Sequence, residues 1–89
     1  MARFEVLIKP SAVKELEAIS PKKERQRIVQ RIRGLAEDPR PQGCQKLSGR
    51  DRYRIRQGAY RIIYSIEDRR LIVFVVKVGH RKDVYRGSL

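Results

Sequence analysis

The stretch that decides the fold runs from Tyr60 to Arg86 and reads YRIIYSIEDRRLIVFVVKVGHRKDVYR. Two apolar runs lie on either side of the polar residues 67–69, which predicts two antiparallel strands, 59–66 and 70–78, joined by a tight turn. The second run is almost continuously apolar, so we expect that strand to be central and buried on both faces. Gly79 ends this strand, and a cluster of cationic residues with a tyrosine, residues 80–86, follows directly.

Two further strands are expected upstream of this pair. Residues 52–56 alternate arginine with tyrosine and isoleucine, and the Gln57-Gly58 turn that follows uses the ability of glycine to adopt a positive φ. These residues and the later pair form a three-stranded antiparallel meander. Apolar side chains also alternate with charged ones over residues 3–9, which predicts a half-buried N-terminal strand.

Between the first strand and the meander, the pattern predicts a hairpin of two helices. One helix is expected from Ser11, as its cap, to about Ile19. A second is expected to about Glu37, with Ser20 as N-cap and Pro21 as the first helical residue. The loop 38–43 follows, because it contains two prolines and a glycine.

The sequence therefore predicts an α+β fold in a single domain, 1–89, with the helices packed on one face of a mainly antiparallel sheet. The polar residues 81–86 favour a short C-terminal turn or helix. The expected core residues are Val6, Ile8, Val13, Leu16, Ile28, Ile32, Leu35, Ile63, Ile72, Phe74 and Val76.

Composition narrows the class of function. The 89 residues carry a formal net charge of +12, of which residues 1–45 contribute +4 and residues 46–89 contribute +8. Such an excess favours polyanionic partners. Cys44 is the only cysteine, which excludes an internal disulfide and fits a reducing cytosol. We expect no metal, no signal peptide and no membrane span, since the longest apolar run, 71–76, is far shorter than the roughly 20 residues that a span needs.

The cations of the meander are expected to converge. The arginines at alternate positions of residues 52–56 share one strand face, and the hairpin brings Arg61 beside them. The end of the last strand adds Arg81 and Tyr85. Such a cluster must face solvent or an anion, because burying like charges together is costly. Arginine binds phosphate in bidentate fashion and tyrosine stacks on bases. Two alternatives stay open: edge arginines also protect a strand against aggregation, and the sole histidine, His80, is either structural or catalytic.

Three motifs carry a resemblance to a known family. Residues 46–49 read KLSG, residues 53–64 read YRIRQGAYRIIY, and residues 78–85 read VGHRKDVY. Together they resemble the RelE-type toxins of bacterial and archaeal toxin–antitoxin modules. The preceding strand and helical hairpin follow that family's order, so the resemblance covers nearly the whole chain.

The resemblance implies the toxin of a type II toxin–antitoxin module. Such toxins are ribosome-dependent endoribonucleases that cleave messenger RNA in the ribosomal A site, inhibit translation in the cytoplasm and need no metal or other cofactor. The 2′-hydroxyl attacks the adjacent phosphorus and leaves a cyclic phosphate and a 5′-hydroxyl. The implied partners are a cognate antitoxin that blocks the site, the ribosome with its message, and operator DNA through the antitoxin complex.

Residue by residue, the resemblance assigns Arg61 to charge stabilisation on the reacting phosphate, Arg81 to the leaving group or transition state, and Tyr85 to a base beside the cut. Arg54 and Arg56 stand where well-studied members have lysines, one of them proposed as the general base. Since an arginine pKa lies above about 12, these two are expected to clamp the oxyanion, and the base is expected to be water, His80, or a group of the ribosome or RNA. Further expected RNA- or phosphate-binding residues are Arg52, Lys46, Lys82 and Arg86.

Two other functions compete with this one. A ParE-type toxin of the same superfamily inhibits DNA gyrase by binding it, but that branch generally lacks the full set of cations and tyrosine. A plain basic module that binds RNA or the ribosome would show affinity that falls steeply with salt, and no strand scission.

Overall fold

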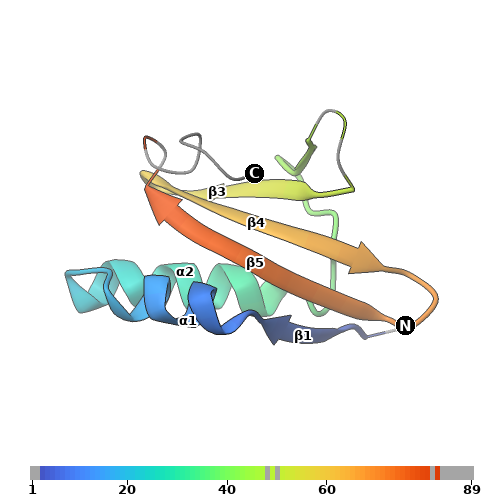
Figure 1. Ribbon diagram of the computed structural model, residues 1–89, viewed down its shortest axis with the longest axis horizontal. Coiled ribbons are helices and arrows are strands. Elements are labelled where there is room, and N and C mark those ends of the chain that lie inside the picture. Colours follow the sequence, from blue (N-terminus) through green and yellow to red (C-terminus); the bar gives the residue numbers. More distant parts are fainter. Residues whose placement is uncertain (1–2, 48, 50, 81, 83–89) are drawn as a thin grey trace.

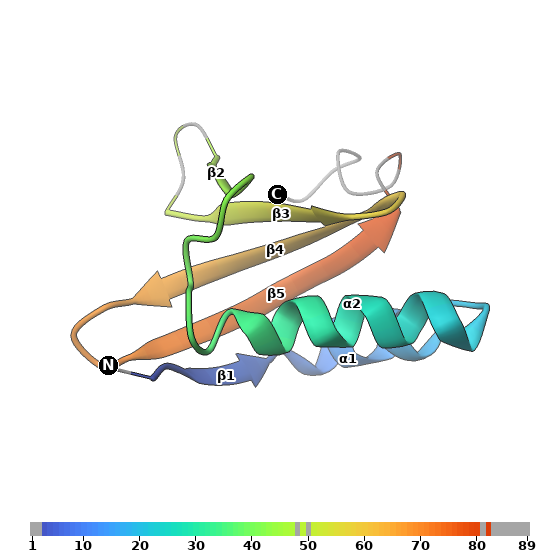
Figure 2. The same cartoon turned by 180° about the vertical axis from the view of Figure 1, so that it is seen from behind.

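In the computed structural model, which describes residues 3–47, 49, 51–80 and 82, two helices lie on one side of a five-stranded sheet (Figures 1 and 2). The elements in chain order are β1 (Glu5–Ile8), α1 (Pro10–Glu17), α2 (Lys22–Gly34), β2 (Gln45–Lys46), β3 (Tyr53–Gln57), β4 (Tyr60–Glu67) and β5 (Ile72–His80). The α+β class, the N-terminal strand, the two helices and the antiparallel meander are confirmed. The expected turn or helix over residues 81–86 lies, apart from Lys82, outside the described residues.

The strand order β1-β5-β4-β3-β2 makes β4 the middle strand. β1 pairs with β5 in parallel, whereas the other neighbours are antiparallel. β5 is an inner strand, paired with β1 and β4, but the expectation that it is buried on both faces is wrong, because Phe74 is 37% exposed. The two-residue strand β2 was not predicted, because so short a segment has no measurable periodicity.

A β-bulge in β5 decides which of its side chains face the helices. β5 contains one residue more than the matching part of β4, and this extra residue is Val76. A bulge reverses the alternation of side chains along the strand. The buried side chains of β5 that join the core are Val73, Val75 and Val78. The sequence instead predicted Ile72, Phe74 and Val76, which are half-buried or exposed.

α1 starts two positions before, and α2 one position after, the place that the capping rules predict. α1 begins at Pro10, so this proline is the first residue of the helix. α2 begins after Pro21, which occupies the N-cap position in an extended conformation. Neither helix has a side-chain cap hydrogen bond, so the expected caps at Ser11 and Ser20 are wrong. α2 ends at Gly34, earlier than expected.

The core fills the space between the helices and the sheet. Expected residues of this core that are buried are Leu16, Ile28, Ile32 and Leu35, whereas Val6 and Ile8 are half-buried. Ile63 is also buried, but it pairs with Arg54 and so lies on the other face of the sheet. Val13 is 37% exposed, and Ala12 is buried in its place. The reason is the phase of α1: residues 12, 16 and 19 follow the helical spacing that faces the sheet, and residue 13 is turned away by about 100°.

The carboxylate of Glu15 on α1 closes the open edge of β5. β1 covers only the first part of that edge, and its last link is the N–H of Lys9, which donates to the carbonyl of Val75 at 2.8 Å. Beyond this point Glu15 Oε1 accepts the N–H of Val78 at 3.0 Å, and Oε2 accepts a hydrogen bond from Lys77 Nζ at 2.8 Å. The helix thus takes the place of a neighbouring strand at an edge that would otherwise be open to another chain.

Replacing Glu15 with alanine should lower the free energy of unfolding by about 1–3 kcal/mol, because the partly buried N–H of Val78 then lacks its acceptor. Glu15→Gln should lose less, since the amide oxygen still accepts that hydrogen bond. Urea denaturation of both variants measures the difference. An equal loss of unfolding free energy in Glu15→Ala and Glu15→Gln would contradict the role of the hydrogen bond from the Val78 N–H.

The side chain of Tyr64 in β4 fastens the loop before β2 to the sheet. Its hydroxyl donates to the carbonyl of Pro39 at 2.7 Å. Arg40 in the same loop makes two hydrogen bonds of 3.0 Å to Asp68, and its guanidinium lies 5.2 Å from the ring centroid of Tyr53. Tyr53 in turn stacks on Tyr64 with 5.9 Å between ring centroids. The loop is therefore held against the end of the meander.

Burial raises the pKa of Tyr64 above its ordinary value of 10.0. From about pH 10 the unfolded chain releases the phenolic proton while the folded chain keeps it. The stability contributed by this group is therefore complete below about pH 10 and falls as the pH rises further. Tyr64→Phe should lose about 1 kcal/mol at neutral pH and should show a shallower decline in stability above about pH 10. Denaturation of the wild type and of Tyr64→Phe at neutral pH and above about pH 10 tests this. An equal decline of the free energy of unfolding with pH in the two proteins would contradict it.

Candidate nucleic-acid interface

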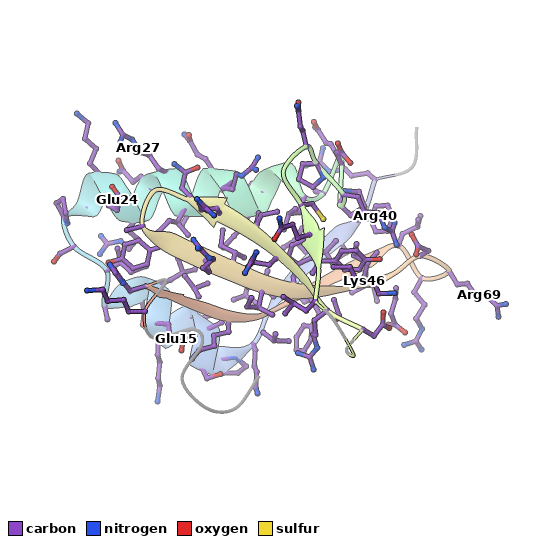
Figure 3. All side chains as sticks on the ribbon, turned by 90° about the horizontal axis from the view of Figure 1, so that it is seen from above. Glu15, Glu24, Arg27, Arg40, Lys46 and Arg69 are labelled. Atoms are coloured by element: carbon purple, nitrogen blue, oxygen red, sulfur yellow. The ribbon has the colours of Figure 1, made fainter. Side chains whose placement is uncertain are left out.

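The β3–β4 hairpin brings three arginines to one face of the sheet. Arg56 pairs directly with Arg61, and Arg54 pairs with Ile63, so these side chains point to the same side. The residues that alternate with them, such as Tyr64, join the core under the helices. The three arginines thus define a cationic face opposite the helices, onto which Figure 3 looks. The convergence expected for Arg54, Arg56 and Arg61 is confirmed.

Arg61 occupies a costly position. It lies in the middle strand and is only 7% exposed. On one side the register places Arg56, and on the other side Gly79, which has no side chain. A like charge directly opposite on a neighbouring strand is unfavourable, and burying a cation is more so. Two guanidinium groups thus lie next to each other at the middle of the sheet.

Arg54 and Arg56 extend the cationic face to the edge of the sheet. Arg54 is half-buried, and it donates a hydrogen bond to Gln45 Oε1 from the neighbouring strand β2. Arg56 is exposed, and β2 ends before it reaches that residue. The arginines therefore present a gradient from a buried group in the middle of the sheet to an accessible group at its edge.

Four ion pairs elsewhere in the described part of the chain can be named. They are Arg3–Glu37, Arg40–Asp68, Arg70–Glu67 and Lys77–Glu15. Arg40 holds the pKa of Asp68 below its usual range through their hydrogen bonds. The carboxylates of the β4–β5 turn, Glu67 and Asp68, are thus taken by arginines outside the cationic face.

A pocket of about 330 Å³ opens beside Arg54 and Arg56 at the β3 edge of the sheet. Its lining residues are Arg31, Gly43, Gln45, Arg54 and Arg56. Arg31 comes from α2 and is half-buried. Sequence reasoning gave Arg31 no role in the site, since helical periodicity alone does not tell which flank of α2 lies over the strand edge.

The structure separates some of the other expected site residues from this face. Lys46 pairs with Tyr53, so it lies on the opposite side of the sheet from Arg54. His80 pairs with Tyr60 and makes an edge contact with that ring at 5.7 Å, which likewise places it on the other side from Arg61.

Three of the expected site residues, Arg81, Tyr85 and Arg86, lie outside the described residues. Two others lie near the ends of strands. Arg52 is half-buried just before β3, and Lys82 is exposed just after β5.

In the part of the chain that the structure describes, no three His, Cys, Asp or Glu side chains form a group that could hold a metal ion. No helix there is long and apolar enough to cross a membrane.

Comparison with known proteins gives the family. A family model described as the ParE toxin of the type II toxin–antitoxin system, parDE, matches residues 6–85. That match covers most of the chain, and the chain therefore belongs to this family of toxins.

Solved structures give the branch of the family that the chain resembles. The chain matches the toxin–antitoxin complex RelBE2 from Mycobacterium tuberculosis with a TM-score of 0.80 and 25% identity, over 91% of this chain and 94% of that chain. It matches the archaeal RelE–RelB complex from Pyrococcus horikoshii OT3 with a TM-score of 0.80 and 30% identity, over 98% and 100%. The isolated E. coli RelE toxin matches with a TM-score of 0.74 and 30% identity, over 94% and 92%.

A curated relative agrees with these structures. Toxin RelG from Mycobacterium tuberculosis (strain ATCC 25618 / H37Rv) is 45% identical over 31 residues, which is 35% of this chain. The match spans 36% of that relative's length. The chain is thus a RelE-type toxin of the RelE/ParE superfamily, as its motifs predicted.

If Arg61 is kept for its charge and not for the fold, Arg61→Met should lower the free energy of unfolding by less than Ile63→Ala does, because an apolar chain of similar length removes the repulsion from Arg56. Ile63→Ala, on the same face, should lower that free energy by about 2–5 kcal/mol. Chemical denaturation compares them. A loss in Arg61→Met as large as that in Ile63→Ala would assign Arg61 to the scaffold.

Proposed function

We propose that this toxin is a ribosome-dependent endoribonuclease that cleaves messenger RNA in the A site and so stops translation in the cytoplasm. The observation that carries the proposal is the convergence of Arg54, Arg56 and Arg61 on one sheet face opposite the helices. Rigid strands hold these groups, so their positive charges are organised before the substrate arrives.

The reaction is an in-line displacement at phosphorus. The 2′-oxygen of one nucleotide forms a bond to the adjacent phosphorus while the bond to the 5′-oxygen breaks. The 2′-hydroxyl proton is lost, and the 5′-oxygen takes up a proton, which leaves a cyclic phosphate and a 5′-hydroxyl. Negative charge grows on the phosphate oxygens in the transition state, and Arg61 with Arg54 and Arg56 stabilises it. Arg81 is assigned to the leaving oxygen and Tyr85 to stacking on a base, as in the family.

The general base is assigned to water or to a group of the ribosome or RNA. Arginine is a very poor proton acceptor, so Arg54 and Arg56 are not assigned this role. His80 pairs with Tyr60 on the other side of the sheet and does not reach the same phosphate. A site without its own base depends on a substrate held in in-line geometry, and such orientation is worth several kcal/mol. Dependence on the ribosome follows from this need.

Further cations are assigned to binding the message. Arg52, Lys82 and Arg86 are assigned to neighbouring phosphates of the message. Lys46 is assigned to the periphery of the RNA path, because it lies on the side of Tyr53. Each such contact adds affinity that weakens with salt.

A cognate antitoxin is the second proposed partner. Two of the matched structures are RelB-type complexes of RelE toxins. Among the described residues, the exposed large apolar side chains are Leu7, Val13, Leu71 and Phe74. Leu7 and Phe74 pair in the β1–β5 register and so form one apolar surface. An acidic, amphipathic antitoxin would cover this surface and neutralise the cations, and operator DNA would be bound through that complex.

Gyrase inhibition is a second candidate function, because the matching family model is described as a ParE toxin. This activity would need a protein-binding surface and no contact with a scissile phosphate. A DNA supercoiling assay with purified gyrase separates it from the first candidate.

On programmed ribosomes, the wild-type toxin should cut the message at the A-site codon, and primer extension should map the ends. Arg61→Ala should reduce the cutting rate by about 100- to 1,000-fold, comparable to loss of one oxyanion-stabilising donor. Arg69→Ala is the matched control, because Arg69 is exposed in the β4–β5 turn, away from the cationic face (Figure 3). Inhibition of gyrase by both variants, without RNA cleavage by the wild type, would replace this proposal with the second one.

A further inference from the structure

The pocket at the β3 edge of the sheet extends the cationic face to α2. Three of its five lining residues are arginines, from two elements that are far apart in the sequence. No acidic residue is among the described residues that line it. Its volume of about 330 Å³ is ample for a phosphate group with some of its water.

The flank of α2 explains why Arg31 reaches this pocket. Glu24 lies two helical turns before Arg31, so the two share a flank of the helix. Glu24 lies at the β3–β4 turn, because a side chain at Gly58 would meet its carboxylate. This flank of α2 therefore runs along β3. Arg31 lies beside Arg56, past the point where β2 stops pairing with β3. Arg27, one turn before Arg31, is exposed and does not line the pocket (Figure 3).

The chemistry of Arg31 also points to an anion. It is half-buried, and its positive charge acts to lower the pKa of the Tyr64 phenol, although burial of that phenol dominates. None of the ion pairs found among the described residues includes Arg31. A half-buried guanidinium beside two further arginines is stabilised by a bound anion.

We infer that Arg31 forms a second phosphate-binding subsite in this pocket, which holds the RNA backbone on the far side of Arg54 and Arg56 from Arg61. This inference rests on the proposed function and adds a substrate-binding residue and a path to it. Neighbouring strands lie about 4.8 Å apart, so Arg61, Arg56 and the pocket follow one another from the middle of the sheet to its edge. The RNA strand therefore crosses the strands of the sheet, from β4 over β3 to α2.

A binding assay with an uncleavable probe tests this subsite without relying on activity. The probe is a short fluorescent 2′-O-methyl oligoribonucleotide, which lacks the attacking hydroxyl, and the readout is anisotropy over a range of salt concentrations. Arg31→Gln should reduce the slope of log affinity against log salt by about 0.7, the value for one phosphate contact to a single strand. Arg27→Gln, on the same helix and with the same change of charge, should leave the slope unchanged. Arg31→Lys should restore it.

A second measurement needs no variant, only the wild-type protein with and without the RNA probe. RNA should protect Arg31 from modification by phenylglyoxal, and Arg27 should stay reactive. Equal effects of the two glutamine variants, or no protection of Arg31, would overturn the subsite. So would an Arg31-dependent affinity for a polyglutamate peptide with none for RNA, because the pocket would then bind an acidic protein segment.

The same samples distinguish the two proposals. RNA binding that depends on Arg31, in a protein that does not cut messages on ribosomes, would keep the subsite and remove the proposed nuclease. Cutting by the wild type, with Arg31→Gln and Arg27→Gln equal in binding and in the toxin concentration needed for half-maximal cutting, would keep the nuclease and remove the subsite.

Discussion

The pairing of Arg56 with Arg61 across the β3–β4 hairpin is the constraint on which the rest of this protein depends. It sets two like charges opposite each other and buries one of them in the middle of the sheet. Such a pair opposes folding. The same register makes the pair useful, because a rigid hairpin holds several guanidinium groups on one face of the sheet.

The rest of the fold offsets this cost at the two ends of the sheet. At one end Glu15 of α1 accepts the N–H of Val78 and closes the edge of β5. At the other end Tyr64 binds the carbonyl of Pro39 and fixes the loop that leads to β2. That loop brings Gln45 to Arg54 and forms one wall of the edge pocket. Packing on the side of the helices thus positions the cations on the opposite side.

Much of this arrangement could be predicted from the sequence, because strand alternation has a period of two and needs only a correct hairpin. It placed Arg54, Arg56 and Arg61 together. It failed in β5, where one extra residue, Val76, reverses the side chains, and no local pattern reveals a bulge. It also missed Arg31, because the contact between a helix flank and a strand edge is set by the packing of the whole molecule. The pairing of His80 with Tyr60 was missed for a similar reason, since adjacency in sequence to a cationic segment does not decide the face of a strand.

The most direct measurement of the central claim is a structure of the toxin on a ribosome with a message that carries a 2′-O-methyl group at the cleavage position. The account predicts that the scissile phosphate lies within hydrogen-bond distance of Arg61 and Arg56, with the sheet face opposite the helices turned toward the RNA. A complex in which the RNA backbone lies against α1 and the outer side of α2, with that sheet face turned to solvent, would contradict it.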